Sequence, residues 1–269
     1  MKKKNITDKS KINIIIYFLL RTLVIISLVI QGIHGNWNNT FLCIFTLILF
    51  TVPDLVSKKL NLKLPNTLEV IVYIFIFSSS ILGEIQNFYD VFPHWDTMLH
   101  TLNGFLCAAV GFSLVDILNN NIDAIDMTPA FVSLVAFCFS MTIGIFWEFI
   151  EFSIDKYLNK DMQKDLIVTK INSIKINDER SNEAVNINDI NRTIICTDKS
   201  SIIIEGGYLD IGLFDTIKDL YVNFIGAIIF CLIGYVYIKN RHEKSFANMF
   251  IPKVNRTINI ENYSKIYYD

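Results

Sequence analysis

Six apolar runs, most of them long enough to cross a lipid bilayer, constrain how this chain can fold. They cover about residues 12–33, 41–56, 66–83, 96–118, 129–157 and 213–238. A helix needs about 20 mainly apolar residues to span the hydrocarbon core, and a spanning segment must satisfy its backbone hydrogen bonds internally. The chain is 52% hydrophobic and 19% charged, too apolar for an ordinary soluble domain. We therefore predict an all-α membrane protein, a polytopic bundle of about six transmembrane helices whose immediate partner is the lipid bilayer.

Lysine and arginine residues are distributed unevenly around these runs. They gather before the first run, between the second and third, and after the last: Lys2, Lys3, Lys4, Lys9, Lys11, Lys58, Lys59, Lys63, Lys239, Arg241 and Lys244. The loop at 159–207 also carries several lysines, but acids balance them and the loop is nearly long enough to escape the charge rule. Basic residues are retained on the cytoplasmic side of a membrane. We therefore predict a multi-pass protein of the cell (cytoplasmic) membrane with both termini in the cytoplasm. The net charge of -2 offers no basic surface for nucleic acid, so no nucleic-acid partner is expected.

Changes in composition divide the chain into five segments. We expect a cytoplasmic basic tail at 1–11, helices one to five within 12–157, a polar extracytoplasmic loop at 158–210, the sixth helix within 211–240 and a cytoplasmic tail at 241–269. The loop is rich in charged residues and Asn. It has β-like pieces around 167–176 and 194–204, the second followed by Gly206 and Gly207, which predict a small β-hairpin.

Two features within the runs bear on helix boundaries and pairing. Pro53 and Asp54 are expected to mark the end of the second span. Arg21 interrupts the first span, where it is expected either to pair with an acid of another helix or to reach toward the cytoplasmic interface.

Polar side chains recur at helical spacing near one end of three predicted spans. The rows are Asp96, His100 and Asn103 in the fourth span, Glu148, Glu151 and Asp155 in the fifth, and Asp215, Asp219 and Asn223 in the sixth. Residues three or four apart share a face of a helix, and each row lies within an arc of about 80° at 3.6 residues per turn. In the orientation predicted above, all three rows lie at the extracytoplasmic end. The sequence therefore predicts three helices that present acids at matching depth.

Several carboxylates in a low-dielectric site cannot all ionise without a counter-charge. A divalent cation supplies it most directly, and oxygen ligands with one imidazole suit Mg²⁺, Mn²⁺, Zn²⁺ or Ca²⁺. The predicted metal ligands are Asp96, His100, Glu148 and Asp219, with Glu151, Asp215 and Asn223 as a second group. His100, Glu151 and Asp215 are the candidates for catalytic acid or base. Alternatively the acids share protons, or Arg21 or Lys218 supplies the positive charge.

Ordinary structural roles also explain these residues. Asp96 fits an N-terminal helix cap. Asp155 and His94 fit polar residues at a membrane interface, and Glu148 with Glu151 fits a structural ion pair. The cysteines lie singly in apolar runs or in the loop, so neither a disulfide framework nor a CxxC metal motif is expected.

These motifs resemble those of the YjdF-like family of bacterial inner-membrane proteins and, more distantly, those of the VanZ-like membrane proteins. The resemblance rests on Asp96-Thr97-Met98-Leu99-His100 with Gly104, Glu148-Phe149-Ile150-Glu151, and Asp215-Thr216-Ile217-Lys218-Asp219 with Asn223, Gly226 and Ala227. It covers about residues 85–238, with the loop at 159–207 resembling an insertion. In VanZ-like proteins the second motif has Gln at the place of Glu151, which puts this chain nearer the YjdF-like side. The resemblance implies a multi-span membrane protein and no defined reaction.

Three functions fit the polar rows. The first is a metal-assisted enzyme acting on a lipid-linked or envelope substrate at the outer face. The second is a binding or transport protein for a cation or proton, although the sixth span is mostly apolar beyond Asn223. The third is a structural or regulatory protein whose polar cluster locks three helices together.

Overall fold

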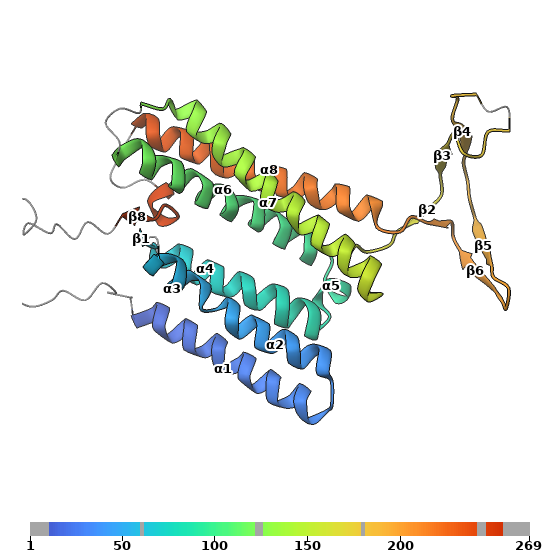
Figure 1. The fold of residues 1–269 in the computed structure, drawn as a ribbon, viewed down its shortest axis with the longest axis horizontal. Helices are drawn as coiled ribbons and strands as arrows, with labels where there is room; N and C mark the ends of the chain where they lie inside the picture. The colour runs from blue at the N-terminus through green and yellow to red at the C-terminus, as the bar shows by residue number, and fades with distance from the viewer. Residues whose placement is uncertain (1–10, 60–61, 122–125, 179–180, 241–245, 255–269) are drawn as a thin grey trace, which may run out of the picture. The chain divides into compact units, whose positions relative to one another are not determined.

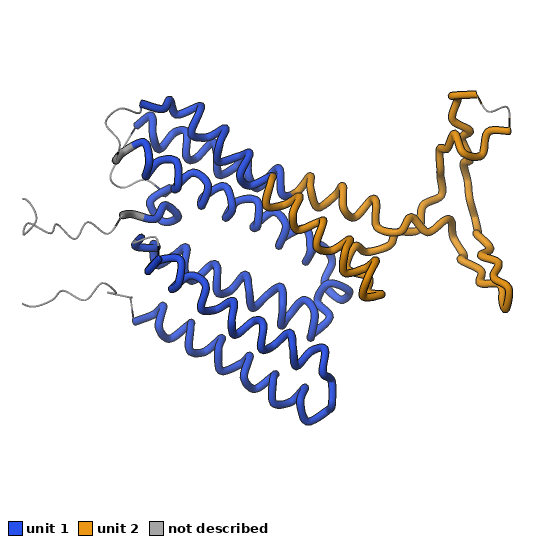
Figure 2. Tube along the Cα trace, in the orientation of Figure 1, with its two compact units in different colours: residues 1–141, 223–269 blue, residues 142–222 orange. Residues whose placement is uncertain are grey.

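The computed structural model describes residues 11–59, 62–121, 126–178, 181–240 and 246–254. Several residues of the orientation argument lie outside this range, among them Lys2, Lys3, Lys4, Lys9, Arg241 and Lys244, and so does the tail from residue 255. The chain forms two compact units, one of residues 1–141 with 223–269 and one of residues 142–222 (Figure 2).

Helices dominate the chain (Figure 1). Their bounds are α1 (Lys11–Ile33), α2 (Trp37–Leu49), α3 (Val52–Lys59), α4 (Asn66–Phe77), the π-helix η1 (Ser78–Ile85), α5 (Phe88–Val91), α6 (Trp95–Asn121), α7 (Pro129–Leu158), α8 (Leu213–Asn240) and the 3-10 helix η2 (Phe246–Met249). Among the described residues, six helical segments are long and apolar enough to cross a membrane: α1, α2 with α3, α4 with η1, α6, α7 and α8. The prediction of a polytopic helical membrane protein is confirmed.

The first unit contains the packed core of α1, α2 and α4, which lie side by side in Figure 1. Val24, Cys43, Phe50, Tyr73 and Ile81 form a buried apolar cluster among them. The rings of Phe50 and Tyr73 pack edge to face, with their centroids 5.7 Å apart. Such contacts hold these helices together in a bilayer, where apolar surface gains little from leaving lipid.

The second span continues past Pro53, so the expectation that Pro53 and Asp54 mark its end is wrong. Helix α2 ends at Leu49, and α3 begins at Val52 and reaches Lys59. Proline is tolerated in the first turn of a helix because the N–H groups there have no intrahelical acceptor. The residue therefore marks a break within the span. Arg21 donates a hydrogen bond to Tyr17 on its own helix, a partner that neither of its two expected placements named.

Helices α6 and α8 approach each other through two glycines of the first unit. A Cβ atom on Gly104 would lie 2.0 Å from the carbonyl oxygen of Asn223, and one on Gly226 would lie 2.0 Å from that of Thr101. Small residues allow close backbone approach between membrane helices. The contact continues along both helices to Phe112 and Phe230, whose rings lie 5.8 Å apart. The two helices therefore run parallel with little room for additional atoms.

Helix α7 runs antiparallel to this pair within the same unit. The Ser140 hydroxyl donates to the carbonyl oxygen of Gly104 at 2.8 Å, and the Ser133 hydroxyl donates to that of Cys231 at 3.2 Å. Buried apolar side chains fill the space around these bonds, including Ala108, Phe112, Val132, Ala136, Ala227 and Phe230. One short strand pair, β1 (Leu62–Lys63) with β8 (Lys253–Val254), also belongs to this unit.

The second unit carries the strands of the polar loop. These are β2 (Ile167–Val168), β3 (Ile171–Ser173), β4 (Val185–Ile187), β5 (Arg192–Cys196), β6 (Ser201–Glu205) and β7 (Tyr208–Leu209). They pair antiparallel as β2 with β7, β3 with β4, and β5 with β6. In the last pair Ile194 faces Ile203 and Ile195 faces Ile202, which confirms the predicted small β-hairpin.

Substituting the two contact glycines is expected to destabilise the bundle. Gly104→Ala or Gly226→Ala would force a Cβ atom into a backbone carbonyl of the neighbouring helix. Overpacking of this kind costs about 1–3 kcal/mol, so we expect a clearly lower melting temperature in detergent. Gly32→Ala in α1 is the matched control, since nothing lies within 4 Å of the added atom. Equal melting temperatures for the three variants would contradict this account of the contact.

Candidate functional site

Asp96 and His100 form a close pair on the first turns of α6. The His100 Nε2 and Asp96 Oδ1 atoms are 3.3 Å apart, and the two side chains are 11% and 25% exposed. Helix α6 begins at Trp95, directly after His94, which has a left-handed backbone with φ of 64°. Asp96 is thus inside the first turn, where a carboxylate complements the helix dipole, and it is not the N-terminal cap.

Asp215 and Asp219 share one ammonium group on α8. The Lys218 Nζ atom is 2.8 Å from Asp215 Oδ1 and 3.5 Å from Asp219 Oδ1. The two carboxylate residues are only 6% and 1% exposed. Because Lys218 carries a single positive charge, it balances one of the two carboxylates that it contacts. The sequence-based suggestion that Lys218 supplies positive charge here is therefore consistent with the geometry.

Asn223, the third member of that row, joins α8 to α6. Its Oδ1 atom accepts a hydrogen bond from the Asn103 amide at 3.1 Å, and its own amide donates to the Met141 sulfur at 3.6 Å. Asn223 is 1% exposed. An amide pair buried between apolar helices fixes their register, because any slip would leave the polar groups in hydrocarbon.

Glu148 and Glu151 are buried near the end of α7, at 5% and 7% exposure. The Trp147 indole N–H donates to Glu151 Oε1 at 2.7 Å. Asp155, one turn further, accepts hydrogen bonds from the backbone amides of Met162 and Gln163 at 2.6 and 2.8 Å. Asp155 therefore holds the chain where it leaves α7, a more specific role than the expected interfacial charge.

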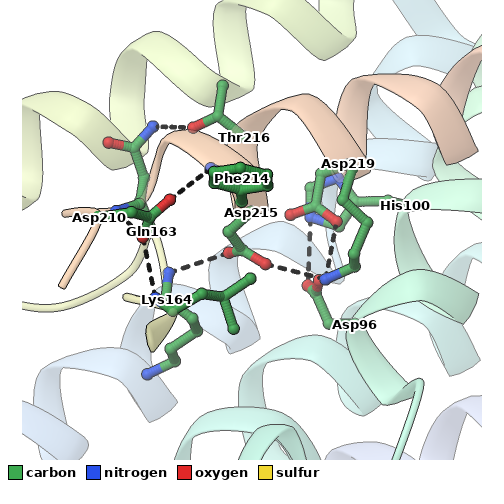
Figure 3. Close-up of polar contacts among 12 residues, drawn as sticks. Asp96, His100, Gln163, Lys164, Asp210, Phe214, Asp215, Thr216 and Asp219 are labelled. Atoms are coloured by element: carbon green, nitrogen blue, oxygen red, sulfur yellow. Dashed lines mark hydrogen bonds and ion pairs between the residues drawn. The ribbon is translucent and has the colours of Figure 1, made fainter. Parts of the chain in front are cut away.

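The loop is tied to the start of α8 by contacts shown in Figure 3. Asp215 Oδ2 accepts from the Lys164 backbone amide at 2.9 Å, and the Gln163 side-chain amide donates to the Thr216 hydroxyl at 2.6 Å. Both oxygens of Asp215 are thus engaged, one by Lys218 and one by this amide. The contacts support a structural role for Asp215 more than the role of a catalytic base.

Asp210 anchors the chain just before α8. It accepts from the backbone amides of Leu166, Gly212 and Phe214 at 2.9, 3.1 and 2.8 Å. Partial burial acts to raise the pKa of Asp210, but the three donated hydrogen bonds outweigh it and the pKa is lowered overall. Sequence reasoning missed this residue. Its signal was an Asp three residues before the first residue of α8, close enough to accept from the amides of the first turn.

Acids gather around the same loop. The pKa of Asp165 is raised by burial first, and then by the negative charges of Asp161, Asp210 and Asp155, against a smaller opposing effect of Lys164. Burial and neighbouring carboxylates thus both favour the protonated form of Asp165.

Two buried acids lie apart from the predicted rows. Glu69 of α4 is 5% exposed and accepts hydrogen bonds from the Asn13 amide at 3.4 Å and the Tyr73 hydroxyl at 3.1 Å. Asp116, in the second half of α6, is 6% exposed. Neither residue was among the predicted site residues. Their position inside apolar runs was the available signal.

Fold and side chains together define a polytopic helical membrane protein with buried carboxylates in several of its spans. The chain belongs to the predicted membrane protein family DUF2238, whose model matches residues 15–240. An uncharacterised protein of Thermotoga maritima is 28% identical over 123 residues, which are 45% of this chain and 62% of the relative. The match thus covers less than two thirds of that relative. No solved structure matches.

Removing Asp210 is expected to loosen the start of α8. The folded-state pKa lies below the unfolded value, so Asp210 stabilises the fold above the unfolded pKa of about 3.9, and this contribution is lost as pH falls through the folded pKa. At neutral pH, Asp210→Ala should cost about 0.5–2 kcal/mol, as for loss of a helix cap. Hydrogen exchange would show this as lower protection of the Leu166 and Phe214 amides.

Asp161→Asn is the control for loop charge, because Asp161 is 61% exposed and its oxygen lies 4.0 Å from Lys164 Nζ. Exposed ion pairs contribute little, so protection in this variant should match the wild type. Unchanged protection in Asp210→Ala at pH 7 would refute the anchoring role.

Proposed function

We propose that this protein binds a divalent cation through Asp96, His100, Glu148 and Asp219, and that it acts as a metal-assisted enzyme on a lipid-linked or envelope substrate. The observation that carries the proposal is the burial of four carboxylates at membrane depth. Glu148, Glu151, Asp215 and Asp219 are each less than one tenth exposed. Burying a charge is costly unless an opposite charge balances it. A divalent cation provides two positive charges at one point.

The positions of the proposed ligands along their helices support the proposal. Asn103 bonds to Asn223, and α6 and α8 run parallel, so His100 and Asp219 are each about one turn before that contact. Ser140 bonds to the Gly104 carbonyl, and α7 runs antiparallel to α6. Along its own helix, Glu148 lies eight residues after Ser140, and Asp96 lies eight residues before Gly104, about 12 Å in each case.

The donor set fits a hard or borderline cation. Three carboxylates and one imidazole suit Mg²⁺, Mn²⁺, Zn²⁺ or Ca²⁺, and a bound ion would act as a Lewis acid or lower the pKa of water. Glu151 is the favoured base, since Asp215 has both oxygens engaged by Lys218 and the Lys164 amide. Asp215 and Asn223 would then position the helices and the loop. His100 would serve as acid or base if protons take the place of the metal.

A structural lock is the second candidate, and the interhelical hydrogen bonds favour it. The Asn103 amide with Asn223, and the hydroxyls of Ser133 and Ser140 with backbone carbonyls, already bind α6, α7 and α8 to one another. In this alternative the buried acids extend the same lock toward the helix ends. A transport role has less support, because the buried side chains of α8 beyond Asn223 are apolar, such as Ala227 and Phe230.

The orientation with both termini in the cytoplasm belongs to this proposal, and it would place the site at the extracytoplasmic face. The described basic residues Lys58, Lys59 and Lys63 support it. Kinship with YjdF-like and, more distantly, VanZ-like proteins stays a prediction from the quoted motifs. We do not extend antibiotic resistance, associated with VanZ-like proteins, to this chain.

Metal analysis of purified protein tests the proposal. After equilibrium dialysis against Mn²⁺ or Zn²⁺, we expect about one bound ion per chain, since the proposal places one ion among its four ligands. Glu148→Gln, which keeps the shape of the side chain but not its charge, should weaken affinity at least about tenfold, the lower limit seen for changes to outer-shell partners. Asp219→Asn and Glu148→Ala should do the same.

Glu69→Gln is the matched control, because Glu69 is equally buried and its described partners are the neutral side chains of Asn13 and Tyr73. It should leave metal binding unchanged even if it lowers the melting temperature. Wild-type protein without stoichiometric metal would overturn the proposal. A loss of thermal stability in Glu148→Gln, in protein that binds no metal, would establish the structural lock instead.

A further inference from the structure

An apolar groove runs along α6 in the first unit, on a different face from the polar row. It has a volume of about 430 Å³, is open on one side, and is lined by His94 just before α6, by residues of α6 from Thr97 to Phe105, and on α8 by Gly226 and Ile229. Its polar lining is slight. The Thr101 hydroxyl, for example, donates to the Thr97 carbonyl of its own helix at 2.7 Å, so its hydrogen-bonding capacity is used within α6.

From this groove we infer a binding site for one acyl chain of a bilayer glycerophospholipid. Both helices that form it are candidate membrane spans, so its open side faces hydrocarbon. It is continuous with lipid-facing surface, since Met98 and Ile229 on its edges are 47% and 45% exposed. In that environment a groove with so slight a polar lining is filled by lipid chains, because water would find few hydrogen-bond partners there.

The depth of the groove fixes which part of the lipid it holds. At the start of α6 and just before it along the chain, Phe88, Phe92 and Trp95 form an aromatic cluster, with ring centroids of Phe88 and Trp95 5.0 Å apart. Such clusters sit at the membrane–water interface. From Thr97 to Phe105 the groove covers eight residue steps of α6, about 12 Å at 1.5 Å per residue. This length fits within one leaflet, which is about half of the 30 Å hydrocarbon core.

The walls of the groove are fixed by the helix contact already described. Gly226 contributes no side chain to its floor, and the approach of α8 to the Thr101 carbonyl leaves no space to add one. At the inner end, the Phe105 ring is held edge to face between Phe230 and Phe250, with centroid distances of 5.1 and 5.0 Å. A rigid groove orders a chain with little reorganisation of the protein.

The lipid site is separate from the proposed cation site. On α6 the groove residues recur at i, i+3, i+4, i+7, i+8 and i+11 from His94, and they form a stripe centred about 160° away from Asp96, His100 and Asn103 at 100° per residue. A chain in the groove therefore lies on the opposite side of α6 from the polar row. We infer a resident lipid that supports α6, not the substrate of the reaction proposed above.

Photolabelling in nanodiscs tests this inference. The probe is a phosphatidylcholine with a diazirine on one acyl chain, and labelled peptides are mapped by mass spectrometry. Because lipid binding between membrane helices rests on packing alone, we expect a modest enrichment, at least about threefold, on residues 97–105 and 226–229 over the lipid-facing surface around Leu232. Thr101→Phe or Ile229→Trp, which fill the groove from either helix, should reduce labelling to that background.

Two matched variants distinguish filling of the groove from a general disturbance of helix packing. Thr101→Val keeps the shape of the side chain, and Leu232→Phe adds a ring at a position of α8 that is 63% exposed and outside the groove. Both should label as the wild type does. Uniform labelling in wild type, or unchanged labelling in Thr101→Phe and Ile229→Trp, would overturn the inference. So would displacement of the label by an added polyprenyl phosphate at equal mole fraction. Glu148→Gln should not alter labelling, so failure of the cation proposal remains distinguishable.

Discussion

The close contact of α6 with α8 is the constraint on which the other features of the first unit depend. Gly104 and Gly226 bring each helix against a backbone carbonyl of the other, and no larger residue fits at either position without moving a helix. In a bilayer this packing, rather than exclusion of apolar surface from water, holds helices together. The contact sets the Asn103 to Asn223 hydrogen bond, and it leaves the side-chain-free floor of the apolar groove. One pair of small residues thus determines both the register of polar side chains and the shape of a lipid-facing surface.

The sequence predicted the six spans well because each depends on one local property, the length of an apolar run. It failed at Pro53, where the same residue is compatible with the end of a helix and with the first turn of the next. The hairpin of β5 and β6 could also be predicted, since two Ile-rich strands flank a short turn. The hydrogen bonds that anchor the loop to Asp215 and Asp155 could not be predicted. They depend on the path of the chain at Gln163 and Lys164, and no local pattern encodes where a polar loop returns.

The candidate site was predictable as a set of residues, but their individual roles were not. Spacing alone could not distinguish the roles of Asp215 and Asp219, since both lie on one face of α8. Their contacts separate them, because Asp215 is held by a loop amide and by Lys218, while Asp219 lies deeper at 1% exposure. Likewise Asn223 was grouped with the ligands and proves to be a helix-to-helix contact. Spacing on a helix identifies a shared face, whereas role depends on what packs against that face.

The chain accommodates its buried and partly buried carboxylates in two chemically different ways. Glu69, Asp155 and Asp210 accept hydrogen bonds from neutral donors, either the side chains of Asn13 and Tyr73 or backbone amides. Neutral donors stabilise a carboxylate locally and require nothing from outside the protein. Asp215 and Asp219 both lie within 3.5 Å of the Lys218 ammonium group, so one basic side chain serves two carboxylates of very low exposure. The acids of this chain are thus stabilised by neutral donors at some positions and by an ammonium group at others, so burial alone does not give them a shared role.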